Sequence, residues 1–465
     1  MGSGEKKRHK LSLSLFSHED SNENSIPKNT VVGFALNVII FLLAALTNIL
    51  IVRILGPKDQ GIYFMVITIN YMIVSLGNMG LGTANTTFLA RKKYRLSDLN
   101  LNSVLVAAGV GGIGIILYLM FRSPLQATVF QGIAPLYVLS GISLVPFTLY
   151  MLFWSSIMIG LNQIILLNKI LLAQTILAFF SVFIALIAFK LGIDGALGAW
   201  FFVNIIFAVI MFFLLHKMDR IKIGINSMAF KESVIFGLKS HIGGIASYIW
   251  LRLDAFLLNM FHGPSAVGYY SVAVNLTEML WRFMQPFYNA VTPKIVGATK
   301  QESEILTTKA TRHVFFILTA IAVVLAPLSP LIIRLLYGSE YLPAYKPMII
   351  LLVGTIGIGV AIPTAVYFTG QLNRPGFLSL LAWINAFINI ALCFVLIPRY
   401  SVTGAALAST LTYIIGFLIL LIVLKSISGL TPSLLLFIKR EDFRDYLDVF
   451  TKIKQLIPSL IKVKK

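Results

Sequence analysis

The sequence predicts an all-α integral membrane protein, with about 12 transmembrane helices in two parallel six-helix repeats around a central cavity. An apolar composition, long uncharged segments and an internal repeat all indicate this fold class. Of the 465 residues, 58% are hydrophobic and 12% are charged, whereas charged residues make up about 25% of an average soluble domain. A soluble fold of this length would need more polar surface, so the composition excludes a soluble protein.

Uncharged segments long enough to cross a bilayer recur along the chain. Residues 123–168, 170–189, 347–373 and 375–398 contain no Asp, Glu, Lys or Arg. A bilayer core of about 30 Å needs about 20 apolar residues as helix, and a helix satisfies its own backbone hydrogen bonds in lipid. We predict spans near residues 31–52, 61–82, 100–121, 132–158, 170–189, 195–215, 240–261, 266–293, 313–335, 347–370, 375–397 and 401–424.

The prolines at positions 135 and 146 both fall inside one predicted span, 132–158. Proline is tolerated in a membrane helix as a kink. Because residues 123–168 are too few for two full helices and a loop, one kinked helix is the simpler prediction.

The distribution of basic residues predicts the orientation of the chain. With twelve spans, both tails and the even-numbered loops share one side, which holds 29 of the 38 Lys and Arg residues, and the opposite loops hold seven. Basic residues accumulate in cytoplasmic loops, so we expect a multi-pass protein of the plasma membrane with both termini in the cytoplasm. The same asymmetry explains the net charge of +20 without a nucleic-acid partner.

Outside the predicted spans, the chain divides into tails and a linker. We expect a cytoplasmic N-terminal tail (1–30), an N-terminal lobe (31–216), a cytoplasmic linker (217–239), a C-terminal lobe (240–424) and a cytoplasmic amphipathic tail (425–465). The tail is amphipathic because apolar residues recur at helical spacing between charged ones: Phe443, Leu447, Phe450, Ile453, Ile457 and Leu460.

An internal repeat relates the two predicted lobes. Residues 55–67 read LGPKDQGIYFMVI, and residues 262–274 read HGPSAVGYYSVAV, so a G-P-x-x-x-G-x-Y pattern recurs at an offset of 207. A second echo pairs GALGA at 195–199 with GAALA at 404–408. Six helices is an even number, so the two repeats would be parallel, an arrangement typical of transporters with a cavity between their halves. We expect Gly-Pro to form a tight turn and the Tyr to lie at the membrane interface.

Several motifs together resemble a known family. The sequence resembles the polysaccharide transporters (Wzx-like oligosaccharide flippases) of the multidrug/oligosaccharidyl-lipid/polysaccharide exporter superfamily, from about residue 30 to 425. The resemblance is carried by RILGP at 53–57, LGNMGLG at 76–82, FGLKS at 236–240, RLD at 252–254 and VGYYS at 267–271. It implies a flippase that moves a polyprenyl-phosphate- or pyrophosphate-linked oligosaccharide to the outer leaflet for surface polysaccharide assembly by alternating access. It also implies membrane lipids and polysaccharide assembly proteins as partners.

Four ionisable residues lie inside predicted spans, where charge is costly and functional. Arg252 and Asp254 are two positions apart and point to different faces, whereas Glu278 and Arg282 are four apart and can pair. One interpretation is a cavity-lining cluster for substrate phosphate or for a coupling ion, H⁺ or Na⁺. The alternative is an ion-pair network that only holds the two helices together.

Uncharged polar residues supply further candidates for the cavity. Asn37 and Asn48 fall on one helix face, as do Asn385 and Asn389. Their amides could bind glycan hydroxyls or form interhelical hydrogen bonds. Arg53 either contacts substrate or extends toward the interface from the end of its helix.

The sequence offers little for metal binding, disulfides or other cofactors. Its one cysteine, Cys393, excludes a disulfide within the chain. No His, Cys, Asp or Glu pair has the spacing of metal ligands, and we expect His216 and His241 to face solvent at cytoplasmic helix ends. No cofactor other than a coupling ion is expected.

Two rival classes remain open at this point. A multidrug/cation antiporter of the same superfamily would need uncompensated acids in the first six spans, where none is predicted. A membrane polymerase or ligase acting on the same lipid-linked sugar would need catalytic groups on a long external loop, and every predicted external loop is short. We therefore expect a protein that is not an enzyme.

The predicted orientation can be tested by thiol labelling. In a Cys393→Ala background, single cysteines replace Ser97, in a predicted cytoplasmic loop, and Ser265, in a predicted outer one. An impermeant thiol reagent added to intact cells should label position 265 alone, because only that loop faces the outside. Labelling of the loop that contains position 97 would overturn the orientation.

Overall fold

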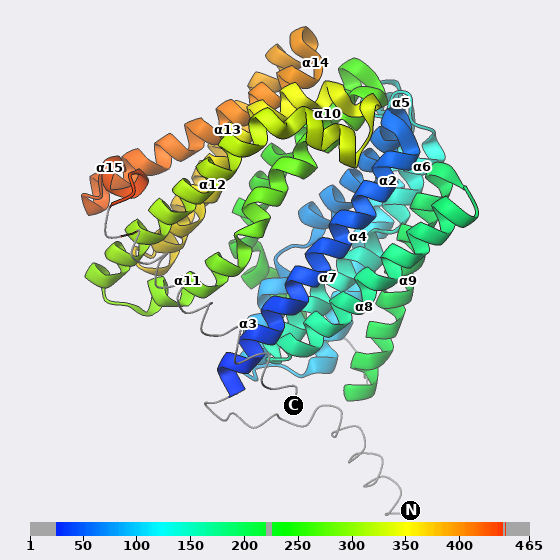
Figure 1. Ribbon diagram of the computed structural model, residues 1–465. Helices are drawn as coiled ribbons and strands as arrows, with labels where there is room; N and C mark the ends of the chain where they lie inside the picture. The colour runs from blue at the N-terminus through cyan, green and yellow to red at the C-terminus, as the bar shows by residue number, and fades with distance from the viewer. Residues whose placement is uncertain (1–24, 220–225, 440–441, 443–465) are drawn as a thin grey trace, which may run out of the picture. The chain divides into compact units, whose positions relative to one another are not determined.

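The computed structural model describes residues 25–219, 226–439 and Asp442, and these residues are almost entirely helical (Figure 1). Within them, nine helices are long and apolar enough to cross a membrane. This confirms an all-α, multi-pass membrane protein. Its helices are α2 (Ser25–Gly77), α3 (Leu81–Ala90), α4 (Leu96–Met120), α5 (Arg122–Ala127), α6 (Pro135–Ser143), α7 (Val145–Gly160), α8 (Ile164–Phe183), the π-helix η1 (Ile184–Ala188), α9 (Gly192–Met218), α10 (Ser227–Phe283), α11 (Gln285–Gly297), α12 (Lys300–Leu336), the 3₁₀-helix η2 (Ser339–Ala344), α13 (Tyr345–Gly370), α14 (Pro375–Ser428) and α15 (Pro432–Leu436).

Three of these helices are long enough to cross a membrane twice. The apolar part of α2 has 42 residues, α10 has 57 and α14 has 54, and 42 helical residues measure about 63 Å, twice a bilayer core of about 30 Å. One residue in each leaves the helical conformation: Gly56, Gly263 and Ser401. Each break separates two predicted spans. Nine helices are therefore compatible with twelve spans, although the number twelve stays a prediction.

The breaks in α2 and α10 have the same local cause. Gly56 (φ 72°, ψ 170°) and Gly263 (φ 76°, ψ −179°) adopt nearly identical conformations that disfavour a side chain. Pro57 and Pro264 follow them, and proline suits the first position of a new helix because it has no N–H to leave unsatisfied. The Gly-Pro turns predicted from the repeat are thus confirmed.

Other boundaries agree with the sequence in part. The predicted kink in span 132–158 is confirmed, since α6 ends at Ser143 and α7 begins at Val145. α10 begins at Ser227, inside the predicted linker 217–239, whose role as a linker stays a prediction. The apolar stripe predicted for the tail, from Phe443 onward, lies outside the described residues.

The chain forms two compact units. The first comprises Met1–Tyr269 and Leu336–Glu340, and the second comprises Tyr270–Leu335 and Tyr341–Lys465. The first part of α10 therefore belongs with the N-terminal helices, whereas the predicted lobes place it in the C-terminal half. The division into two six-helix lobes stays a prediction.

The first unit packs α2, α3, α4, α6, α8 and α9 around α7. Its apolar core centres on residues of α7 that are fully buried, among them Phe153 and Trp154. Buried polar side chains also join these helices, as is common in membranes. These hydrogen bonds connect Asn70 with Thr148 (3.1 Å), Asn85 with Ser103 (2.9 Å) and Tyr150 with Asn100 (2.9 Å).

The second unit packs α13 against α14 and α11, with Tyr367, Phe368 and Leu424 fully buried. A buried ion pair, 2.8 Å long, joins Arg312 of α12 to Asp442. Burial alone would raise the pKa of the Asp442 carboxyl, but the backbone N–H of Lys439 and the Arg312 guanidinium hold it below its ordinary value. This pair ties the chain after α15 to α12.

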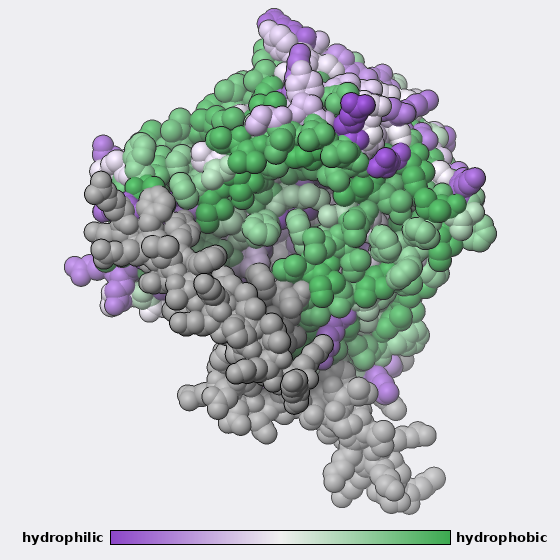
Figure 2. Space-filling view, viewed as in Figure 1, coloured by the Kyte–Doolittle hydropathy of each residue, from purple (hydrophilic) through white to green (hydrophobic). Residues whose placement is uncertain are grey.

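The helices expose apolar side chains over much of their length. Figure 2 shows mostly apolar residues on the viewed face, with hydrophilic residues concentrated near helix ends. On α4, Ile113, Ile116 and Met120 are 59%, 65% and 72% exposed. A soluble protein would not expose such a stripe, whereas a lipid-facing helix requires it. Ser97 is buried (3% exposed), so exposed Arg91 of the same predicted loop is the better position for the thiol labelling.

Candidate functional site

The ion pair predicted between Glu278 and Arg282 is present in the second part of α10. An Nη2 atom of Arg282 donates to Oε2 of Glu278 at 2.6 Å. The Glu278 side chain is 10% exposed and that of Arg282 is 53% exposed. The guanidinium also lies 5.6 Å from the ring centre of Trp281, within range of a cation–π interaction. A buried carboxylate thus holds a half-exposed cation, which retains donors for a further anion.

Arg252 and Asp254 lie in the first part of α10, before the break. Asp254 is buried (2% exposed), and its Oδ1 accepts a hydrogen bond from the N–H of Ala255 at 2.7 Å. Arg252 is half-buried, and its Nη1 donates to the Leu251 carbonyl at 3.3 Å. These two residues belong to the first unit and the Glu278–Arg282 pair to the second. A single cluster of all four therefore stays a prediction.

The predicted polar residues of the first span differ in their surroundings. The Asn37 side chain is exposed and donates to the Gly33 carbonyl of its own helix at 2.8 Å. Oδ1 of Asn48 is buried, and no group in the described part of the chain donates to it. Arg53 is exposed. Among these three residues, Asn48 thus has a side-chain oxygen that could still accept a hydrogen bond from a ligand.

Asn385 and Asn389 instead lie between the two parts of α14. Asn389 is fully buried, and its Nδ2 lies 3.4 Å from the Thr412 hydroxyl. A Cβ at Gly416 would overlap the Asn385 side chain. These contacts favour the interhelical interpretation of this pair over glycan binding.

The two predicted solvent-facing histidines differ. His216 stacks on Phe212 with ring centres 6.2 Å apart. His241 is buried (9% exposed), so its prediction is wrong. Its Nε2 lies 2.6 Å from the Ser75 carbonyl, which can only accept, so Nε2 carries a proton. Ser75 lies in the last turn of α2, where carbonyls lose their helical partners.

The two copies of the G-P-x-x-x-G-x-Y pattern pack directly against each other. A Cβ at Gly61 would overlap the Pro264 carbonyl, and a Cβ at Gly268 would overlap the Pro57 carbonyl. The second glycine of each copy thus contacts the proline of the other, which is the reciprocal contact that a two-fold relation requires. The tyrosines of the pattern, Tyr63 and Tyr270, are 8% and 1% exposed. They are core residues, and their place at the depth of the membrane interface stays a prediction.

A loop between α5 and α6 fastens onto the end of the first part of α10. The Gln131 side chain donates to the carbonyls of Asn259 (3.0 Å) and Met260 (2.5 Å). Pro264 has no N–H for the Met260 carbonyl, four residues earlier, so Gln131 replaces a lost helical bond. The Asn259 side chain donates back to the carbonyls of Val129 (2.8 Å) and Gln131 (3.2 Å).

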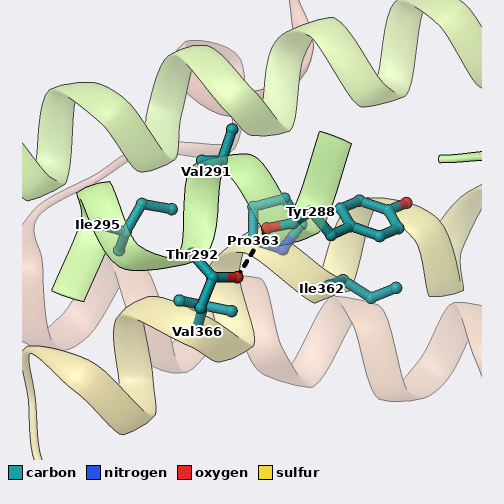
Figure 3. Close-up of a pocket in the computed structure, with 7 residues that line it drawn as sticks. All are labelled: Tyr288, Val291, Thr292, Ile295, Ile362, Pro363 and Val366. Carbon is teal, nitrogen blue, oxygen red and sulfur yellow. Dashed lines mark hydrogen bonds between the residues drawn. The ribbon is translucent and has the colours of Figure 1, made fainter. Parts of the chain in front are cut away.

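A small pocket lies between α11 and α13 in the second unit (Figure 3). Its cavity volume is about 10 Å³, about the space that one water molecule needs and far below the roughly 300–1,000 Å³ of typical ligand sites. The Thr292 hydroxyl, which lines it, donates to the Tyr288 carbonyl of its own helix (2.8 Å). The Tyr288 hydroxyl donates to the Gly359 carbonyl (3.0 Å), which Pro363 leaves without a helical partner. Its size and apolar walls make it a packing gap and exclude it as a saccharide site. The lining residues are Tyr288, Val291, Thr292, Ile295, Ile362, Pro363 and Val366.

Comparison with known proteins decides the family. A family model described as polysaccharide biosynthesis protein matches residues 50–346, which is more than half of the chain. The chain belongs to this family. It is 24% identical over 404 residues to the capsular polysaccharide biosynthesis protein CapF of Staphylococcus aureus, covering 84% of this chain and 97% of CapF. The family resemblance expected from the sequence motifs is thereby confirmed.

Solved structures share the fold. A structure of the lipid II flippase MurJ in an inward closed conformation matches with a TM-score of 0.70 and 18% identity, covering 85% of this chain and 87% of MurJ. An inward-facing multidrug resistance MATE transporter of the MOP superfamily matches with a TM-score of 0.69 and 15% identity, covering 86% and 99%. At these identities the likeness shows the fold alone.

Sequence reasoning missed Gln131, Asn259 and the role of His241. One signal was available: Pro264 follows a long apolar helix and must leave an upstream carbonyl without its donor. The identity of the donor depends on which loop reaches that carbonyl, and local sequence patterns do not encode this.

The different burial of Glu278 and Arg282 predicts unequal effects of removing each partner. Arg282→Leu leaves a buried carboxylate without its cation and should cost about 1–3 kcal/mol, less than the roughly 3–5 kcal/mol of a fully buried pair. Glu278→Leu leaves a half-exposed cation that water can solvate, so it should cost less. The double variant should recover most of the loss, as measured by thermal unfolding of purified protein. Lys93→Gln, which breaks the exposed Lys93–Glu232 pair, is the matched control and should change stability less than either single variant, because water screens an exposed pair. If Arg282→Leu and Glu278→Leu lowered the stability equally, the result would contradict a buried Glu278 paired with a half-exposed Arg282.

Proposed function

We propose that this protein is a flippase that moves a lipid-linked oligosaccharide from the cytoplasmic to the outer leaflet for surface polysaccharide assembly. The observation that carries the proposal is the coincidence of a polysaccharide biosynthesis family with a transporter fold. A membrane protein of such a pathway can make the glycan or move it. The likeness to CapF supports the pathway and the likeness to MurJ supports movement.

The internal repeat supports alternating access as the mechanism. Its two Gly-Pro copies meet reciprocally, as expected of two halves related by a two-fold axis. Transporters built from parallel repeats move their halves around a site near the bilayer midplane. The proposed cycle takes place in the plasma membrane with both termini in the cytoplasm, and polysaccharide assembly proteins are the proposed partners.

The charged residues of α10 are the proposed contacts for the substrate head group. Arg252 and Arg282 would bind phosphate or pyrophosphate, since guanidinium donors match phosphate oxygens. Asp254 and Glu278 would hold these cations or bind the coupling ion, H⁺ or Na⁺. The half-exposed Arg282 on its buried Glu278 supports this role, because the cation is fixed and still has donors to offer.

Two other functions compete with this proposal. The fold is shared with multidrug transporters, so a cation antiporter is the main alternative. A polymerase or ligase would be an enzyme of the same pathway. The family match favours saccharide transport over drug transport, and the transporter fold favours movement over synthesis.

A reconstituted flipping assay tests the proposal. Proteoliposomes carry a fluorescent pyrophosphate-linked oligosaccharide on a polyprenyl lipid, and an impermeant quencher reports how much reaches the opposite leaflet. The parent should accelerate flipping. Arg252→Gln and the Arg282→Leu/Glu278→Leu double variant should each reduce the rate by roughly tenfold or more, about 1.4 kcal/mol, with normal membrane abundance. Arg334→Gln, an exposed arginine at the end of α12, is the matched control and should retain the rate.

Two outcomes would count against the proposal. Transport of a lipophilic cation without flipping of the saccharide lipid would favour the antiporter. A stable and fully active Arg282→Leu/Glu278→Leu variant would remove the functional role of that pair.

A further inference from the structure

One seam in the first unit runs the length of a membrane-spanning helix. On one side lie the second part of α2, α3 and the following loop (residues 57–93), and on the other lies the start of α10 through its break (residues 232–268). We name these contacts the α2–α10 seam. Both sides belong to the same compact unit, although the sequence repeat assigns them to different halves.

At the predicted cytoplasmic end, two backbones touch without side chains between them. A Cβ at Gly80 would overlap the Gly237 carbonyl, and a Cβ at Gly237 would overlap the Met79 carbonyl. Beside this contact, the rings of Phe88 and Phe236 lie 5.3 Å apart. The seam ends there in the ion pair between Lys93 and Glu232, 2.5 Å long.

In its middle, the seam is held by side chains of α10 that reach backbone carbonyls of α2. His241 donates to the Ser75 carbonyl at 2.6 Å, and the Tyr248 hydroxyl lies 3.4 Å from the Thr68 carbonyl. At the other end come the Gly61–Pro264 contact and, from a neighbouring loop, Gln131 on the carbonyls that the α10 break releases.

Separating the first part of α10 from α2 and from the loop that carries Gln131 would leave backbone groups unsatisfied in a low-dielectric interior. The Ser75 carbonyl has no helical partner because α2 ends, and His241 donates to it instead. The Met260 carbonyl has none because Pro264 lacks an N–H, and Gln131 donates to it instead. A buried acceptor left without its donor carries its full desolvation penalty. The glycines also let the two backbones pack closely, and a larger residue at Gly80 or Gly237 would prevent this packing.

The repeat does not provide a second seam of this kind. The repeat relates positions that are 207 residues apart. The position equivalent to Gly80 holds Phe287, the position equivalent to Gly237 holds Thr30, and the position equivalent to His241 holds Phe34. The glycine pair and the histidine thus occur in one copy of the repeat and not in the other. The two halves therefore differ in sequence at the positions that form the seam.

From these contacts we propose that residues 227–262 move as part of the N-terminal unit during transport. The joint between the moving bodies is then the Gly263–Pro264 break, in place of the predicted linker 217–239. This proposal rests on the proposed transport function for its role, but the rigidity of the seam is measurable without transport.

Spin-label distances test the rigidity directly. In a Cys393→Ala background, labels at Arg91→Cys and Lys231→Cys flank the seam at exposed positions. Double electron–electron resonance in liposomes should give one narrow distance distribution, unchanged by a pyrophosphate-linked oligosaccharide lipid. A reference pair, Arg91→Cys with Arg374→Cys of the second unit, should shift or broaden under the same conditions. A seam pair that shows two distances, or that shifts with the reference pair, would overturn the proposal.

A crosslinking experiment adds the functional readout. A short bifunctional maleimide joins Lys93→Cys to Glu232→Cys, and each single-cysteine variant treated alike serves as control. The crosslinked protein should flip the saccharide lipid within about twofold of its controls, and loss of flipping on crosslinking alone would overturn the proposal. If the parent itself does not flip that lipid, the proposed function fails, while the spin-label result still decides whether the seam is rigid.

Discussion

A backbone carbonyl inside a bilayer must find a donor within the protein, and this constraint organises the structure around its prolines. Pro264 releases the Met260 carbonyl, which Gln131 then binds. Pro363 releases the Gly359 carbonyl, which the Tyr288 hydroxyl binds. Each repair requires a specific neighbouring helix or loop to lie close by. The breaks that shape the helices therefore also determine which elements must pack together.

Much of the fold could be predicted because the bilayer imposes a simple code. Apolar length predicted the membrane helices, and the Gly-Pro pairs predicted the breaks at Gly56 and Gly263. The spacing of Glu278 and Arg282 predicted their pairing. Contacts distant in sequence escaped prediction. His241 looked like a solvent-facing residue at a helix end, yet it is buried because the last turn of α2 presents a carbonyl to it.

The unit boundaries show why a sequence repeat need not define the moving parts. The two Gly-Pro copies meet reciprocally, as repeats should, but the first part of α10 packs with the N-terminal helices along its whole length. Glycines at positions 80 and 237 make this approach close, and the matching positions of the other half hold larger residues. A duplicated fold can thus acquire asymmetry through a few substitutions.

The central claim is that a lipid-linked saccharide is the cargo and that arginines of α10 bind its phosphate. Family and fold support the cargo, and the buried Glu278 that fixes a half-exposed Arg282 supports the contact. The most direct test is a cryo-EM structure in lipid nanodiscs with a pyrophosphate-linked oligosaccharide lipid. Phosphate density within hydrogen-bond distance of Arg252 or Arg282 is the predicted result. Saturated substrate density with its phosphate elsewhere, or no binding at saturating lipid, would contradict the account.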